Sequence, residues 1–171
     1  MRREVDEEFA RYVGVRQHRL LRAAFLVCGD ARLAQDLLEG ALARLAARWD
    51  RLRGEDPDAY LRRTLYREAV SSWRHARRDS LHLHLAAPLG TTEPTGFGGI
   101  GDRIDLEQAL EQLTARQRAV LVLRFFEDCT EVETAEALGL PTRGVRRQAQ
   151  AALTTLRAVV PDLAHTGGDL P

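Results

Sequence analysis

The sequence predicts an all-α fold of two small helical domains joined by a flexible linker. Apolar residues recur at intervals of three and four along most of the 171-residue chain, which is the period of an amphipathic helix. Helix-capping residues precede several of these segments, and a glycine-rich stretch separates residues 1–78 from residues 104–160. The length itself suits one domain or two small ones.

The first domain, residues 1–78, contains three predicted helices. The first covers about residues 6–27 and ends at Gly29. Asp30 is a good N-cap for the second, whose apolar stripe consists of Leu38, Leu42, Leu45 and Trp49. Asp56 and Pro57 supply an N-cap and a first-turn proline for the third, which runs to about Arg78. Its stripe, at intervals of four, consists of Leu61, Leu65, Ala69 and Trp73.

The helical pattern fails over residues 79–103. Glycines, prolines and threonines dominate this stretch, and so long a glycine-rich segment is unusual inside a compact domain. We therefore interpret it as a flexible linker. The alternative, a lid loop over an active site, has no catalytic group nearby to support it.

The sequence of the second domain, residues 104–160, predicts shorter helices, and the last two of them form a helix-turn-helix. Thr114 and Thr130 each begin a capping box, with Gln117 and Glu133 three residues later. Ala135, Gly139 and Val145 have the spacing of a helix-turn-helix, which needs a small residue, a turn glycine and an apolar anchor. The last helix runs to about Val159, and residues 161–171 are expected to form a disordered tail.

Charge is balanced overall but strongly patterned along the chain. There are 25 basic and 25 acidic residues, and all the basic ones are arginine. Two explanations fit this preference for arginine over lysine: a GC-rich genome, or a need for contacts with phosphate groups. In two segments, residues 60–78 and 140–157, the charged residues are almost all basic. In residues 127–136 they are all acidic. Two basic helices in different domains favour a nucleic-acid-binding protein.

Several other classes are excluded by the sequence. No apolar run approaches the ~20 residues of a membrane span, and the N-terminus lacks the apolar region of a signal peptide. Cys28 and Cys129 are expected to be small buried hydrophobes in a reducing, cytoplasmic compartment. The histidines lack metal-ligand spacing, and no nucleophile motif or phosphate loop is present. We therefore expect no cofactor, no metal, no small-molecule substrate and no enzymatic activity.

Residues 112–128, together with Glu131 to Gly139 and Val145 to Arg157, resemble region 4 of the extracytoplasmic-function (ECF) sigma factors. These belong to the sigma-70 superfamily of bacterial transcription initiation factors. Gly29-Asp30, residues 34–38 and Ala41-Leu42 resemble region 2.2 of the same family. Residues 57–63 and the helix through Trp73-Arg74 resemble regions 2.3 and 2.4. The order and spacing of these segments make the resemblance highly specific over most of residues 6–158.

The resemblance implies an alternative sigma factor that binds core RNA polymerase, through its β′ clamp and β flap, and promoter DNA. An anti-sigma factor is a further partner that it suggests. Residues implied to bind the polymerase are Asp36, Leu37, Glu39, Ala41 and Leu42. Those implied to contact the −10 element are Tyr60, Arg62, Arg63, Tyr66, Arg67, Trp73, Arg74, Arg77 and Arg78. Those implied to contact the −35 element are Thr142, Arg143, Arg146, Arg147 and Gln150.

The third helix has the chemistry for opening a duplex, because arginines bind the backbone and aromatic rings stack on exposed bases. Tyr66 lies off the apolar stripe, which makes it a candidate for stacking. Trp73 lies on the stripe, so that core packing and base stacking both stay open for it.

Some positions depart from the family pattern. Glu39-Gly40 replaces the usual glutamine-glutamate pair, Arg67 stands where asparagine is common, and Pro141-Thr142-Arg143-Gly144 replaces a serine-led start of the recognition helix. Two alternatives therefore stay open. One is a sigma-like DNA-binding regulator that no longer docks on polymerase, and the other is a helical protein-interaction module.

Overall fold

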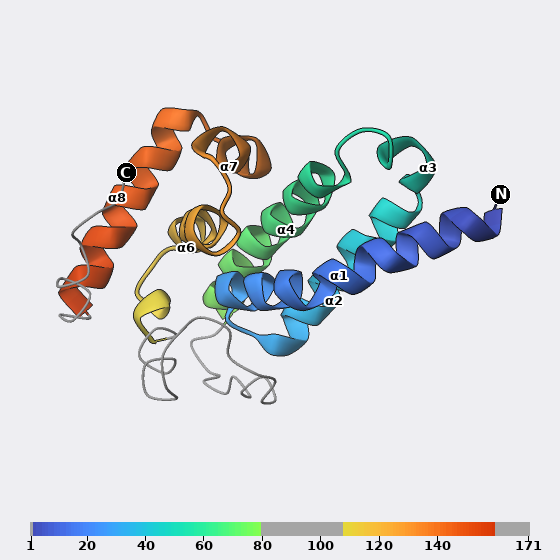
Figure 1. The fold of residues 1–171 in the computed structure, drawn as a ribbon. Helices are drawn as coiled ribbons and strands as arrows, with labels where there is room; N and C mark the ends of the chain where they lie inside the picture. Colours follow the sequence, from blue (N-terminus) through green and yellow to red (C-terminus); the bar gives the residue numbers. More distant parts are fainter. Residues whose placement is uncertain (1, 80–107, 160–171) are drawn as a thin grey trace.

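The helices of the two halves pack into a single body (Figure 1). This computed structural model describes residues 2–79 and 108–159. All regular elements in those ranges are helical, which confirms the all-α prediction. The predicted linker and tail lie outside the described residues, apart from Asp79 at the linker's first position. The division into two domains at residues 78 and 104 stays a prediction.

The first half consists of four helices, in the order α1 (Arg2–Cys28), α2 (Ala31–Ala46), α3 (Trp49–Leu52) and α4 (Pro57–Asp79). Asp30 caps α2, because its carboxylate accepts a hydrogen bond from the backbone N–H of Leu33 at 2.7 Å. Asp56 accepts in the same way from Ala59 in front of α4. Both predicted N-caps are confirmed.

The prediction that Trp49 continues the second helix is wrong. Helix α2 ends at Ala46, and Trp49 begins the separate short helix α3. Its ring is buried against Phe9 and Tyr12 of α1, with ring centroids 5.1 and 4.9 Å apart. Trp49 is therefore in the core, as expected, but it reaches the core from α3 and not from the apolar stripe of α2.

The second half contains α6 (Ala115–Leu121), the π-helical turn η1 (Val122–Phe126), α7 (Glu131–Leu138) and α8 (Thr142–Val159). A helical stretch at residues 108–111 precedes α6. Both predicted capping boxes, at Thr114 and Thr130, are present with reciprocal hydrogen bonds. The π-helical turn was not predicted, since nothing in a periodic pattern distinguishes it from an α-helical end.

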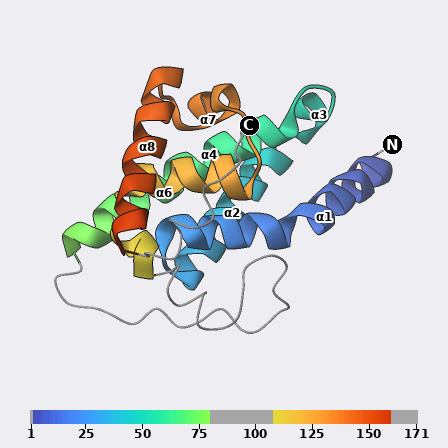
Figure 2. The same cartoon turned by 60° about the vertical axis from the view of Figure 1, so that its left-hand side comes forward.

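One hydrophobic core runs through both halves. Leu45, Leu61 and Leu65 from the first half belong to the same buried cluster as Leu113 and Leu123 from the second. Helices α6 and α7 pack against α4, while α8 packs on α6 and α7 (Figures 1 and 2). Both cysteines are buried as predicted. No helix in the described ranges combines the length and apolar character needed to cross a bilayer.

Candidate nucleic-acid interface

Helices α7 and α8 form the predicted helix-turn-helix. Gly139 follows α7 with a left-handed φ of +64°, a conformation that favours glycine. Ala135 of α7 and Val145 of α8 are buried together with Val120 in a small apolar cluster. These contacts fix the angle between the helices, and they determine which face of α8 points outward.

The outward face of α8 carries most of the predicted −35 side chains. Arg143, Arg147 and Gln150 are exposed, and Thr142 is partly exposed at the first helical position. No carboxylate of the described residues pairs with Arg143 or Arg147. Arginine in this setting is suited to phosphate oxygens or to the O6 and N7 atoms of guanine.

Arg146 differs from its neighbours on the same face. Its Nε lies 2.6 Å from a carboxylate oxygen of Glu131 at the start of α7, although 67% of its side chain remains accessible. This ion pair joins the two helices of the motif. The Nε donor of Arg146 must therefore leave Glu131 before the whole guanidinium can contact DNA.

Apart from Tyr66 and Arg67, the predicted −10 side chains of α4 divide into three groups. Arg63 is exposed and Tyr60 is partly buried, with the Arg63 guanidinium 6.0 Å from the Tyr60 ring centroid. The Tyr60 hydroxyl also accepts a hydrogen bond from Arg48 at 2.9 Å. Arg62 is partly buried. The side chains of Trp73, Arg74, Arg77 and Arg78 lie outside the described residues, so both interpretations of Trp73 stay open.

Tyr66 corrects the stacking prediction. Its side chain is completely buried, and its hydroxyl has no hydrogen-bond partner among the described residues. Burial raises its pKa, and so do the charges of Glu127 and Cys129, which come from the second half of the chain. Helix α4 is covered on two sides, by the first half and by the η1–α7 connection, so a residue off one stripe is still buried.

Arg67 also departs from its predicted role in this arrangement. Its Nε donates to the carbonyl of Ala137 at 3.1 Å, and its Nη2 donates to that of Glu136 at 3.2 Å. Both carbonyls belong to the last turn of α7. The guanidinium predicted to bind DNA therefore binds the helix-turn-helix of the same chain.

The predicted polymerase-binding set on α2 is likewise split. Asp36 and Glu39 are exposed, and Leu42 is partly buried. Leu37 and Ala41 are corrections, because both are buried in the core. Helix α2 packs on both α1 and α4, which makes its buried face broader than the single stripe used to predict it.

Two arginines that join the halves, Arg19 and Arg118, were missed by sequence reasoning. Arg19 of α1 donates to the Phe126 carbonyl and pairs with Glu127 at 3.3 Å and Asp128 at 3.2 Å. Burial raises the pKa of Glu127, and the charges of Arg19 and Arg62 oppose that effect. Arg118 of α6 reaches the end of α1. Only the acidic run at residues 127–136 hinted at such contacts.

A charged cluster also fixes α1 against α4. Asp58 accepts hydrogen bonds from the Tyr12 hydroxyl at 2.5 Å and from Arg16 Nε at 2.8 Å. Burial alone raises the pKa of Asp58, but these two hydrogen bonds outweigh it and leave that pKa below its usual value. Asp58 thus has a structural role at the start of α4.

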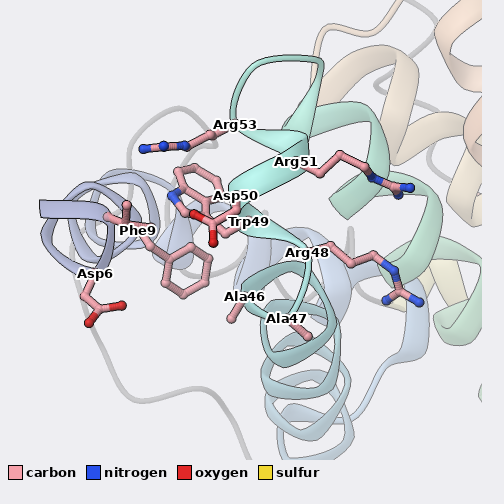
Figure 3. A pocket seen from close by; sticks show the side chains of 10 residues that line it. Asp6, Phe9, Ala46, Ala47, Arg48, Trp49, Asp50, Arg51 and Arg53 are labelled. Carbon is pink, nitrogen blue, oxygen red and sulfur yellow. The ribbon is translucent and has the colours of Figure 1, made fainter. Parts of the chain in front are cut away.

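A sizeable hollow of the described residues lies apart from these side chains. It has a volume of about 970 Å³ and lies between the N-terminal part of α1 and helix α3 (Figure 3). Phe9 and Trp49 face each other within it, while Arg48 and Arg51 point to one side. None of the predicted polymerase- or DNA-binding residues lines it.

Comparison with known proteins decides the family. Residues 103–156 match the family model "Sigma-70, region 4". The chain is 36% identical over 151 residues to the RNA polymerase sigma-E factors of Streptomyces avermitilis and Streptomyces coelicolor. Each alignment covers 88% of this chain, with 83% and 84% of the respective relative. The chain belongs to the ECF sigma factors. It is an alternative sigma factor, a promoter-recognition factor of transcription initiation.

A solved sigma-factor structure shares the fold. The sigma factor RpoE of Bartonella quintana, solved in complex with the anti-sigma factor NepR, superposes with a TM-score of 0.73 at 21% identity. The likeness covers 91% of this sigma factor and 98% of the Bartonella chain. It therefore extends over the helices of both halves.

Proposed function

We propose that this sigma factor binds core RNA polymerase and places α8 in the major groove of the −35 element. The observation that carries the proposal is the outward face of α8, where Arg143, Arg147 and Gln150 are exposed next to Arg146. A helix-turn-helix presents its second helix to the major groove in this way. Arginine pairs with guanine and glutamine with adenine, so this face offers direct readout of sequence.

The −10 element is assigned to α4 in the same proposal. Arg63 is already exposed and Tyr60 is partly exposed, but Tyr66 is buried and Arg67 is bound to α7. The two halves must therefore separate before the whole helix can engage DNA. We interpret the arrangement described here as a closed form that cannot melt a promoter.

The exposed carboxylates of Asp36 and Glu39 on α2 define the proposed docking surface for the β′ clamp, with Leu42 beside them. The second half is assigned to the β flap. The relatives are named RNA polymerase sigma factors, and the Bartonella neighbour was solved with an anti-sigma factor. We extend both kinds of partner to this chain, together with a cytoplasmic site of action and no catalytic activity of its own.

The test combines co-purification with core polymerase and run-off transcription on a library of genomic fragments. We expect Asp36→Arg to lose co-purification while the far-UV circular dichroism spectrum stays unchanged. Glu7→Arg makes the same charge change on the exposed face of α1 and should behave as wild type.

Each negative result in these experiments supports a different interpretation of the chain. If Asp36→Arg co-purifies as well as the wild type, the docking surface is wrong. If the wild type binds DNA with strong salt dependence but never co-purifies, it is a regulator that has lost polymerase. If it binds neither, the chain is a protein-interaction module.

A further inference from the structure

Two arginines join the halves in a reciprocal way. Arg67, on α4 of the first half, donates to the last-turn carbonyls of α7 in the second half. Arg118, on α6 of the second half, donates from Nε to the Leu26 carbonyl in the last turn of α1, at 3.1 Å. Each half thus supplies an arginine that caps the carboxyl end of a helix in the other half.

Both capped helices end at a left-handed glycine. Gly29 has φ +75° and Gly139 has φ +64°. The turn at Gly29 donates to the carbonyl of Phe25 at 2.7 Å, and the turn after α7 donates from Leu140 to that of Ala135 at 2.9 Å. These turns satisfy some of the terminal carbonyls that every helix leaves open, and the arginines satisfy others.

The glycines also let the guanidinium groups approach closely. A Cβ at position 139 would lie 3.1 Å from Arg67 Nη2, and one at position 29 would lie 3.5 Å from Arg118 Nη2. At this range a cation also interacts favourably with the negative end of the helix dipole.

The two arginines differ in their access to solvent. Arg118 is only 4% exposed, so its charge stays buried while the halves are closed. Arg67 is exposed at the rim of the same interface. A buried charge depends strongly on its hydrogen bonds, whereas an exposed one can exchange them for a solvent-borne anion.

We propose that Arg67 and Arg118 are a two-point latch that holds the closed form, and that DNA phosphates compete with α7 for Arg67. Arg118 supplies the buried point of the latch, which breaks only when the halves separate, and Arg67 supplies the exposed point that a ligand can release first. The competition rests on the proposed function, because it takes α4 as a DNA-binding helix. The latch itself does not depend on it.

Cys129 provides a probe of opening. Its thiol lies in the η1–α7 connection, is 3% exposed, and experiences the charge of Arg62 on α4. In the full-length protein, the rate at which N-ethylmaleimide labels Cys129 can be followed by peptide mass spectrometry. Loss of a hydrogen bond from a charged group raises the open population by about tenfold or more. We expect Arg67→Gln and Arg118→Gln each to raise the labelling rate by about that factor.

Arg51→Gln is the matched control, since Arg51 is exposed on α3 and has no part in the interface. It should label at the wild-type rate. If both latch variants also label at that rate, the latch is refuted. If Arg118→Gln does not fold, the exposed Arg67→Gln decides alone.

A separate experiment tests whether DNA phosphates compete with α7 for Arg67. Adding a mixed-sequence single-stranded DNA oligonucleotide should speed labelling of the wild type several-fold, and should affect Arg67→Gln less. No change in the wild type would overturn the competition. None of these readouts needs polymerase, so a chain that fails to bind polymerase would refute the proposed function and still report on the latch.

Discussion

Helices α4 and α8 are both rich in arginine, and the sequence pattern assigns both to DNA. On α8, Arg143 and Arg147 point to solvent, and Arg146 is held only by an exposed ion pair. On α4, Tyr66 is buried and Arg67 binds the end of α7. One helix is therefore ready for DNA in the closed form, whereas the other is partly committed to the protein itself.

The difference teaches how arginine should be interpreted in a sequence. A guanidinium group has five donors, which serve a phosphate, a guanine or a helix carboxyl end equally well. A local excess of positive charge identifies all of these arginines together. Only the fold shows which of them already has an acceptor.

The largest effect should follow from removing two arginines of α8 together. We expect the Arg146→Ala/Arg147→Ala double variant to reduce transcription from its promoters by at least about 30-fold, since each bidentate guanine contact contributes about 1–3 kcal/mol. Arg147→Ala should have the larger single effect, because Arg146 first has to leave Glu131. Promoter-library transcription measures both strength and sequence preference.

Arg157→Ala is the control for that experiment, because it makes the same change in the last turn of α8, away from the predicted contacts. It should leave promoter choice unchanged. If the double variant initiates at the same promoters with the same strength, α8 does not recognise DNA sequence. The proposed difference between a DNA-ready α8 and a protein-bound α4 would then be wrong.

The second effect concerns the turn that Arg67 contacts. Gly139→Ala places a Cβ 3.1 Å from the guanidinium and forces alanine into a left-handed conformation. We expect the free energy of unfolding to fall by about 1–2 kcal/mol. Urea denaturation measures it. Gly54→Ala, in the open turn before α4, should have a much smaller effect, since nothing lies within 4 Å of its new Cβ.

Repeating Gly139→Ala in an Arg67→Gln background separates the backbone strain at position 139 from the close contact between the new Cβ and the Arg67 guanidinium. Part of the destabilisation should disappear there, since the neighbour is no longer the same guanidinium. An identical loss in both backgrounds would show that Arg67 and Gly139 are energetically independent.

The sequence was a good guide wherever local chemistry decides the structure. The N-caps Asp30 and Asp56, both capping boxes and the turn at Gly139 are all confirmed. Each depends on a few neighbouring residues, so that one sequence window contains all the information needed. The helix-turn-helix followed from the same kind of signal.

Long-range packing decided the rest. Leu37, Ala41 and Tyr66 are buried because α2 and α4 each have two neighbouring surfaces, and one apolar stripe reveals only one of them. Arg118 reads as an ordinary surface residue of α6 until the end of α1 is placed beside it. No window of the sequence contains both partners, which are 92 residues apart.

A smaller effect distinguishes two tyrosines of α4. The Tyr66 hydroxyl is buried and has no hydrogen-bond partner in residues 2–79 and 108–159, whereas that of Tyr60 accepts a hydrogen bond from Arg48. We expect Tyr66→Phe to stabilise the protein by about 1 kcal/mol, because an unsatisfied buried hydroxyl is lost. Tyr60→Phe should be neutral or slightly destabilising. Thermal and urea unfolding of both variants measure this, and the same sign for the two would contradict the burial of Tyr66.

The smallest effect tests the cluster that fixes α4 on α1. Asp58→Asn removes the charged partner of Arg16 and weakens the bond from Tyr12, so stability at pH 7 should fall by about 1 kcal/mol. The folded pKa of Asp58 lies below its usual value, so its contribution is complete above about pH 4 and is lost as the pH falls through the folded pKa.

The difference in stability between wild type and Asp58→Asn should therefore be constant from neutral pH down to about pH 5 and shrink as the pH falls through the folded pKa of Asp58. Urea denaturation over this range measures it, with Asp50→Asn on the exposed surface of α3 as the control. Glu127 acts in the opposite sense, because burial raises its pKa. The charge of Asp58 raises that pKa further, so Asp58→Asn relieves part of the Glu127 effect, and Glu127 cancels only in part from the difference. A difference that grows as the pH falls would show that Asp58 is not held ionised by Arg16 and Tyr12, and that α4 is fixed on α1 by apolar packing alone.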